Sequence, residues 1–405
     1  SEWSVTPSIL TSRGNFQREY PPFYYAAMSV FAGDDIVLSV MTMRLVNVAL
    51  FVLLSSLLFW LIPRRRPVLI WAWLITTMPL GLFLIGSNNP SGWAVTGIGT
   101  AWLALLGYFE STGPRKIALG ALFTVGAIMA AGSRGDAALY VFGAIGVVAI
   151  LTFARTRQYL LSLILPVVVA ALALALFATS GQVGAGINGF GGAGSSSEQV
   201  VEVGLDGFGL LAYNVLNVPF LWAGVFGEWG LGWLDTSLPA IVPLGAIAVF
   251  VAVGFAGLAR IEWRRLISVM GVVLVLIVVP VYVLTQGGDQ VGQGVQPRYI
   301  IPLIVLLGGL LALGIRAGRE SFGRVQVALL GVTLVVCYFV AIQVNMRRYV
   351  TGIDQPGLNL DQGAEWWWNV PFSPMAVWIV GTLAFGAVVA IVLREIHATR
   401  PRLEV

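Results

Sequence analysis

Histidine and cysteine are almost absent from this chain. Among 405 residues there is one histidine, His397, and one cysteine, Cys337. A single cysteine excludes an internal disulfide and any metal site built from several cysteines. His397 is equally alone, and we expect it to be a solvated residue near the C-terminus.

Charge is also scarce. Charged residues make up 10% of the chain, against roughly 25% in soluble globular proteins. Hydrophobic residues make up 58%, and the mean hydropathy is +0.88. This composition excludes a soluble globular protein and predicts an all-α integral membrane protein.

Long apolar runs occupy most of the sequence. A helix that spans a bilayer needs about 17 to 25 predominantly apolar residues. On this basis the sequence predicts eleven transmembrane helices in this chain. They are expected at 37–62, 67–86, 93–109, 117–132, 137–154, 159–179, 238–258, 266–285, 299–315, 325–345 and 375–393.

The basic residues predict the orientation. Sixteen of the 23 lie in six short connections that fall on one side of this threading, while 14 of the 19 acidic residues lie on the other. Cytoplasmic loops of membrane proteins carry such an excess of Lys and Arg. We therefore expect a multi-pass protein of a bacterial cytoplasmic membrane. The net charge of +4 then reflects topology, so no nucleic-acid partner is expected.

The whole chain, 1–405, reads as a single membrane domain. Because it opens with a polar exterior segment, we expect a further transmembrane helix upstream of Ser1, making twelve. In order, the expected parts are the exterior loop 1–36, six helices over 37–179, a large exterior loop 180–237, five helices over 238–393 with exterior loops 286–298 and 346–374, and a cytoplasmic tail 394–405.

The segment Phe208–Phe226 is nearly apolar enough to be another span. If it crossed the membrane, every later basic connection would move to the exterior, against the charge bias. We therefore expect it to form short interfacial or re-entrant helices within the exterior loop.

Three arginines are expected at the outer end of the helices. A guanidinium at that depth can bind a lipid phosphate through two hydrogen bonds, because its planar fork matches phosphate oxygens. We regard these residues as candidate ligands of a donor phosphate. They are Arg44, Arg134 and Arg298.

Each arginine also has a structural interpretation. Arg44 can pair with Asp34 or Asp35 at the start of its helix, and Arg134 can pair with Asp136 in its own turn. Arg298 can be an ordinary anchor at the membrane interface. Asp136 is also a candidate ligand of a sugar or acceptor.

Two exterior segments could hold a sugar. Asn88 and Asn89 lie in a compact turn whose amides can orient sugar hydroxyls, although turn geometry alone explains these residue types. Further along, two carboxylates and two indoles lie close together in sequence, which suits a stacked sugar acceptor and a general base. A helix-capping role for the second carboxylate is the alternative. These residues are Glu228, Trp229, Trp233 and Asp235.

Four motifs carry a resemblance to a known family. They are Glu19 to Tyr25 (EYPPFYY), Asn89 to Gly92 (NPSG), Gly232 to Thr236 (GWLDT) and Gln296 to Tyr299 (QPRY) followed by Pro302. In this order, and over nearly the whole chain, they resemble an uncharacterised bacterial family of predicted membrane proteins. That family is grouped with the GT-C glycosyltransferases, which use polyprenyl-phosphate sugars.

The resemblance implies an exterior active site, to which Glu19 and Tyr20 would contribute as a candidate base and a sugar ligand. The chain departs from the pattern in two places. Trp93 and Ala94 stand where an acidic residue is expected, and Pro297 stands where a glycine usually precedes Arg-Tyr. GT-C enzymes generally carry their catalytic acid near the first helix, so the principal base is expected upstream of this chain.

The sequence thus favours a membrane glycosyltransferase that transfers a sugar from a polyprenyl-phosphate donor to an envelope glycan or lipid on the outer face. No cofactor is expected beyond the lipid-linked donor, and a divalent metal is not indicated. A polymerase or ligase that uses a pyrophosphate-linked donor is one alternative. A lipid-sugar flippase or transporter is another, and it would need a polar pathway across the bilayer.

Overall fold

The computed structural model describes residues 20–178, 180–181, 207–232, 234–259, 261–315, 321–352, 354, 357–368 and 370–398. Within these ranges the regular elements are helices, which confirms the predicted all-α class. In chain order they are α1 (Phe23–Ser29), α2 (Ile36–Leu61), η3 (Pro63–Arg65), α3 (Arg66–Thr76), α4 (Leu80–Ile85), α5 (Pro90–Glu110), α6 (Gly113–Ala131), α7 (Gly135–Thr152), α8 (Arg157–Ser162), α9 (Ile164–Ala178), α11 (Gly207–Val225), α12 (Ile241–Leu258), α13 (Trp263–Gly287), α14 (Pro297–Ala312), α15 (Arg324–Val350) and α16 (Pro374–Ala398).

Ten segments in the described part of the chain are helical, long and apolar enough to cross a membrane. Nine of them coincide with predicted spans. In this count α8 and α9 together form one apolar segment. The tenth is α11, which the sequence analysis placed in the exterior loop. The nine are α2, α5, α6, α7, α8 with α9, α12, α13, α15 and α16.

The other two predicted spans differ from expectation. The span 67–86 is interrupted after Thr76 and continues as α4, because Pro79 has no N–H to donate within a helix. The span 299–315 is the 16-residue α14, which is shorter than a typical transmembrane helix. Most of its side chains are buried against other helices, so its length is not set by contact with lipid.

The prediction of short helices over 208–226 was wrong. Gly207–Val225 is one continuous helix of 19 residues that tolerates Pro219 in its interior. It follows the last part of α13, where Asn214 bonds to the Asp289 carbonyl beyond the end of that helix. Near the C-terminal end of α11, Gly224 abuts the ring of Pro297 at the start of α14, and the Trp222 indole donates to the Leu276 carbonyl within α13 at 3.2 Å. Helix α11 therefore packs along the last part of α13, with its C-terminal end beside the start of α14.

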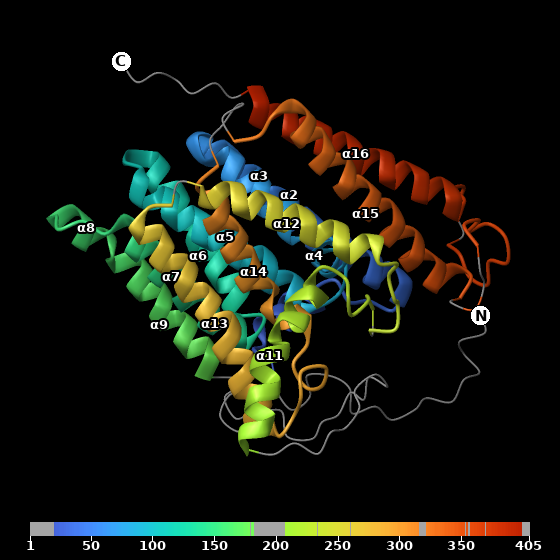
Figure 1. Cartoon of the computed structure of the whole chain (residues 1–405), viewed down its shortest axis with the longest axis horizontal. Helices are drawn as coiled ribbons and strands as arrows, with labels where there is room; N and C mark the ends of the chain where they lie inside the picture. The colour runs from blue at the N-terminus through green and yellow to red at the C-terminus, as the bar shows by residue number, and fades with distance from the viewer. Residues whose placement is uncertain are drawn as a thin grey trace.

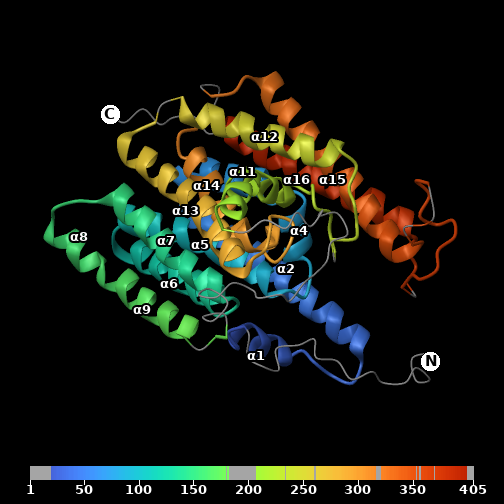
Figure 2. The same ribbon diagram turned by 60° about the horizontal axis from the view of Figure 1, so that its bottom comes forward.

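The helices form a central group flanked by two peripheral ones. In Figures 1 and 2, α6, α7 and α9 lie on one side, and α12, α15 and α16 lie on the other, with α15 and α16 as an antiparallel pair. Helix α5 is central, since 89% of its apolar window is buried, against 6% for α2. This burial explains why α5 can be the least hydropathic of the ten candidate spans: its neighbours are protein and not lipid.

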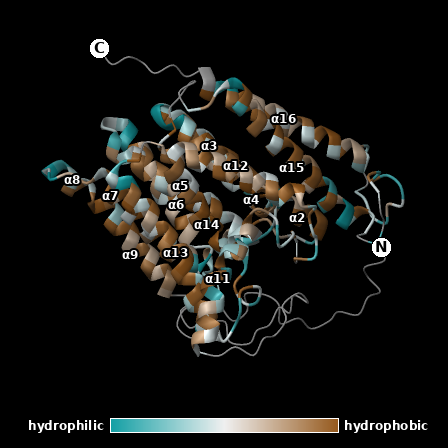
Figure 3. Cartoon of the chain, in the orientation of Figure 1, coloured by the Kyte–Doolittle hydropathy of each residue, from teal (hydrophilic) through white to brown (hydrophobic). Residues whose placement is uncertain are grey.

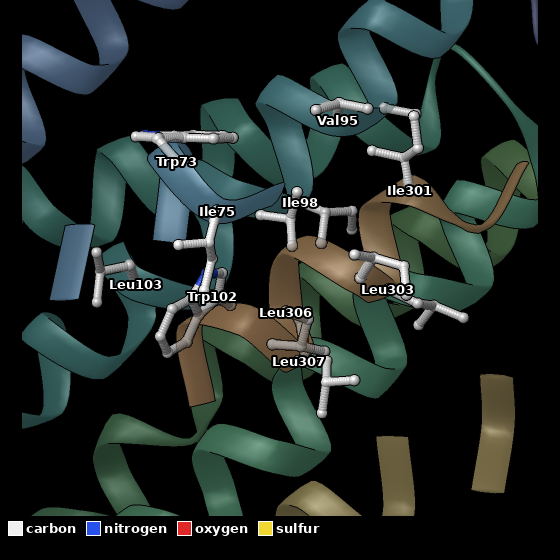
Figure 4. Close-up of a cluster of buried hydrophobic side chains, with 14 of the residues drawn as sticks. Trp73, Ile75, Val95, Ile98, Trp102, Leu103, Ile301, Leu303, Leu306 and Leu307 are labelled. Carbon is white, nitrogen blue, oxygen red and sulfur yellow. The ribbon is translucent and has the colours of Figure 1, made fainter. Parts of the chain in front are cut away.

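The core lies where α3, α5 and α14 meet. Figure 4 shows Trp73 and Ile75 of α3, Ile98 and Trp102 of α5, and Leu306 of α14 directed into one cluster. Glycines make room for the indoles, because Gly99 abuts the ring of Trp73 and Gly309 abuts that of Trp102. The three helices are thus held in fixed register by ring-to-backbone contacts.

The most extensive contact between two helices joins α5 and α6. A Cβ atom added at Gly97 would lie 2.5 Å from the carbonyl oxygen of Gly126 and 2.9 Å from the Cβ of Ala130. Small residues at such a crossing allow the backbones to approach, which is the usual basis of helix association in membranes. This contact fixes α5 and, with it, the turn that precedes it.

The basic connections lie together at one end of the helix bundle. Arg65 pairs with Glu110 at the end of α5 at 2.6 Å, and Arg66 pairs with Glu395 of α16 at 3.1 Å. Figure 3 shows hydrophilic colour at helix ends and hydrophobic colour along most of their lengths. The opposite end holds the starts of α5, α7 and α14.

We predict that Gly97→Val destabilises the folded protein by about 1 to 3 kcal/mol, since a Cβ and two methyl groups would have to enter the α5–α6 contact. The thermal midpoint of the detergent-solubilised protein, followed by tryptophan fluorescence, would measure the loss. Gly143→Val on α7 is the matched control, because a Cβ there meets no atom within 4 Å. Equal midpoints for the two variants would contradict the assigned helix contact.

Candidate functional site

Three helices begin at one place on the end of the bundle opposite the basic connections. Asn89 caps α5 by accepting a hydrogen bond from the Ser91 amide at 2.8 Å. Arg134 is the N-cap residue of α7, and Gln296 is that of α14. Helix N-termini carry partial positive charge and free amide donors, so a convergence of three favours an anion.

Arg134 lies at the centre of this convergence. Its side chain is 3% exposed, and its Nε and Nη2 donate to the two carboxylate oxygens of Asp136 at 2.9 and 2.8 Å. Its Nη1 lies 3.4 Å from the Ser91 hydroxyl at the start of α5. The structure therefore contains the ion pair between Arg134 and Asp136 that the structural interpretation predicted. The Arg134 guanidinium also contacts α5 through Ser91.

The pKa of Arg134 has opposing causes. Burial by itself lowers the pKa of the guanidinium, but the charge and hydrogen bonds of Asp136 outweigh it and raise the pKa above its ordinary value. Arg134 is therefore a permanent cation in a buried position.

Two tyrosine rings cover the Arg134 guanidinium. Its Cζ lies 4.3 Å from the ring centroid of Tyr299 on α14 and 5.5 Å from that of Tyr20. Such contacts stabilise a desolvated cation. Burial raises the pKa of Tyr20 despite the nearby arginines, so its hydroxyl stays protonated and able to donate a hydrogen bond.

Arg298 lies beside this cluster, but it is less buried than Arg134 and lacks an ion pair with a described residue. It is half-buried, its Cζ lies 5.3 Å from the Tyr299 ring centroid, and its Nη2 lies 3.4 Å from the Tyr299 hydroxyl. Its Nε is buried without a hydrogen-bond partner in the described structure. Arg298 forms no ion pair with a described carboxylate, Asp289 included. The guanidinium retains donors for a ligand.

A small cavity of about 30 Å³ adjoins Arg298. Its lining brings together three of the sequence motifs, through Asn89, the stretch Gly230 to Gly232, and Gln296 with Pro297. A cavity of this size holds water and not a sugar. A larger ligand must therefore bind across its mouth or displace the 226–240 loop.

The loop that follows α11 carries the two carboxylates that the sequence analysis proposed as candidate bases, Glu228 and Asp235. Asp235 was expected as a base or as a helix cap, but α12 begins at Ile241 with Ala240 as its N-cap residue, so the cap interpretation was wrong. Instead the Asp235 carboxylate accepts two hydrogen bonds from Arg348 of α15, at 2.6 and 3.0 Å. Glu228 is exposed and forms no ion pair with a described residue.

Trp229, in the same loop, donates from its indole nitrogen to the Phe220 carbonyl at 3.1 Å. Its ring packs on that of Phe220, with the centroids 5.5 Å apart. One face of the indole is therefore used in holding the loop against α11. Two further candidates, Glu19 and Trp233, lie outside the described residues.

Arg44 and Asn88 lie on the α2 side of the site. Asn88 is exposed, and its amide lies 3.3 Å from the Val40 carbonyl of α2. Arg44 forms no ion pair with a described carboxylate, so the expected pairing with Asp34 or Asp35 was wrong. Asp35 instead caps α2 by accepting from the Leu38 amide at 2.9 Å.

An additional polar network lies one helical turn from Arg44. Asn47, which is 5% exposed, accepts a hydrogen bond from the Trp93 indole at 2.8 Å and donates to the Ser87 carbonyl at 2.9 Å. Trp93 occupies a position where an acidic residue was expected from the family pattern. Its indole here ties α2 to α5 and holds no charge.

Sequence reasoning missed Tyr299, Ser91, Asn47 and Arg348. Tyr299 and Ser91 were within the quoted motifs, so their place beside Arg134 follows once the motifs meet in space. Arg348 gave no sequence signal, because it lies 113 residues from its partner Asp235. In the described part of the chain, no group of three or more His, Cys, Asp or Glu residues is arranged to hold a metal ion.

We predict that Asp136→Asn lowers stability by about 3 kcal/mol, because it leaves the buried Arg134 cation without its counter-charge. Thermal unfolding in detergent would measure the change, with exposed Asp34→Asn as the control. The double variant Arg134→Met with Asp136→Leu should regain most of the loss, since no charge is then buried. A single variant as stable as the wild type would refute the role of the pair.

Comparison with known proteins gives one family. The family described as predicted membrane protein, DUF2142, matches residues 5–307, a range that includes all four quoted motifs. No curated protein and no solved structure matches the chain. The expectation of an uncharacterised family of predicted membrane proteins is thereby confirmed, while its grouping with GT-C enzymes stays a proposal. The chain belongs to the DUF2142 family of membrane proteins.

Proposed function

We propose that this protein is a glycosyltransferase of GT-C type that transfers a sugar from a polyprenyl-phosphate donor to an envelope glycan or lipid at the outer face of the bacterial cytoplasmic membrane. The observation that supports it most is the half-buried Arg298, whose Nε lacks a partner in the described structure, beside three convergent helix N-termini. A phosphate monoester carried by a lipid matches that charge and position.

The roles of the two arginines differ in this proposal. Arg134 is saturated by Asp136, so it positions the cluster and contributes a fixed positive field. Arg298 donates to the phosphate and stabilises the negative charge that develops as the sugar leaves. Arg44 does not line the cavity beside Arg298 and forms no ion pair with a described carboxylate, so its role as a phosphate ligand stays a prediction from the sequence.

The acceptor side is assigned to the 226–240 loop. The acceptor hydroxyl attacks the anomeric carbon, the bond from that carbon to the phosphate oxygen breaks, and a carboxylate takes the hydroxyl proton. Glu228 suits the base, because it is exposed and pairs with no described cation. Asp235 is tied to Arg348 and instead holds the loop. Tyr20, Asn88 and Asn89 remain candidates for sugar hydroxyls.

The main rival enzyme uses a diphosphate-linked donor, which would also need exterior arginines. Purified protein in lipid nanodiscs, given membrane extract as acceptor, can be supplied with radiolabelled polyprenyl-monophosphate sugar or with the diphosphate form. Transfer from the monophosphate alone supports the proposal. Transfer from the diphosphate alone assigns the rival activity, and transport without transfer assigns a flippase.

We predict that Arg298→Gln weakens binding of a photoreactive polyprenyl monophosphate about 10- to 100-fold, as expected for losing charge-assisted hydrogen bonds. Crosslinking yield against concentration would measure it. Exposed Arg155→Gln, at the basic end, is the control and should bind as the wild type does. Unchanged crosslinking by Arg298→Gln would remove the central support of the proposal.

We predict that Glu228→Gln lowers kcat about 10²- to 10⁴-fold, the range for loss of a general base, while crosslinking to the donor is kept. Asp235→Asn, in contrast, should raise KM more than it lowers kcat, because it frees the loop from α15. If Glu228→Gln turns over normally, the base lies elsewhere in the protein.

A further inference from the structure

A second site lies at the opposite end of the protein, between α15 and α16. A groove of about 530 Å³ runs between these helices, which is within the usual size range of ligand pockets. Two arginines, Arg324 and Arg394, are the only charged residues that line it. The remaining lining residues are valine, alanine, glycine and leucine.

Small side chains explain the groove. Gly331 lies at its floor, with Val389 and Leu393 buried against it, since a Cβ at Gly331 would lie 2.8 Å from Leu393 Cδ1. The walls remain open: Val332 is 60% exposed, and Ala390 is exposed on the facing helix. Figures 1 and 3 show α15 and α16 as a largely hydrophobic pair at the edge of the bundle. The groove is thus accessible from the lipid side.

The groove has the length of one lipid leaflet. From Arg324 to Val336, the range of α15 that lines it, twelve helical steps of about 1.5 Å cover about 18 Å. Half of a hydrocarbon core of about 30 Å is about 15 Å. An acyl chain along the floor would therefore reach from the mouth to the centre of the bilayer.

The charge at the mouth is positive and uncompensated by described residues. Arg324 and Arg394 are both exposed, and neither forms an ion pair in the described part of the chain. The nearest carboxylate in sequence, Glu395, pairs with Arg66 of α3. The first turn of α15 also begins at this mouth, which adds partial positive charge.

We propose that this groove binds one anionic phospholipid of the cytoplasmic leaflet. Its phosphate lies between Arg324 and Arg394, and one acyl chain lies on the Gly331, Val389 and Leu393 floor. The leaflet follows from the predicted orientation, in which the basic end is cytoplasmic. Basic pockets between transmembrane helices on that side bind anionic headgroups. The site is separate from the proposed donor site and does not depend on it.

Native mass spectrometry of the full chain, delipidated in detergent, tests the proposal. The probes are phosphatidylglycerol and phosphatidylcholine with identical dioleoyl chains. We expect the wild type to retain one phosphatidylglycerol at least tenfold more tightly than phosphatidylcholine, and the double variant R324Q/R394Q to lose that preference. Inorganic phosphate at millimolar concentration should not displace the lipid, because it has no chain to occupy the floor.

A second variant separates the groove from general surface charge. Ala390→Trp should fill the groove and abolish the retained lipid, whereas Ala384→Trp, exposed on the same helix outside the groove, should not. Thermal unfolding of each variant establishes that it is folded. Equal retention of both lipids, an unchanged R324Q/R394Q variant, or displacement by phosphate would each overturn the proposal. A protein dimer that Ala390→Trp dissociates would also overturn it, because a second copy of the chain would then occupy the groove.

Discussion

The buried ion pair of Arg134 with Asp136 constrains the end of the helix bundle that lies opposite the basic connections. A guanidinium that is 3% exposed is tolerated only where a carboxylate and aromatic faces replace water. The partners come from different helices: Asp136 from the first turn of α7, Tyr299 from that of α14, and the Ser91 hydroxyl from that of α5. The pair therefore ties three helix starts together, and Arg298 is held beside them.

That arrangement depends on close packing deeper in the bundle. Gly97 and Gly126 let α5 approach α6, and Gly309 lets α14 approach the ring of Trp102. Since α5 is enclosed by protein, it can carry glycine, threonine and serine without contact with lipid. The low hydropathy of α5 and the polar cluster at its start thus have one cause, which is its central position.

The sequence predicted the helices well because a bilayer requires each spanning segment to satisfy its own backbone hydrogen bonds. It failed at the break before Pro79, where a residue without an N–H interrupts the helix, and at α11, which is one continuous helix although the charge bias argued against a further span. Within the site, the Arg134 pair was foreseen because its partners lie two residues apart. The pairing of Asp235 with Arg348 was not, since composition and spacing say nothing about which distant charges meet.

The arginines fall into two physical classes. Arg65 and Arg66 pair with carboxylates of other helices, while Arg134 pairs within the start of α7 and contacts α5 and α14 through Ser91 and Tyr299. Arg298 and Arg324 form no ion pair within the described ranges and adjoin cavities. A cation beside an apolar, low-dielectric surface binds most strongly to an anion that also carries an apolar chain, because the chain covers that surface. Lipid phosphates have that form at either face of a membrane, so the two sites that we propose share a single chemistry of recognition.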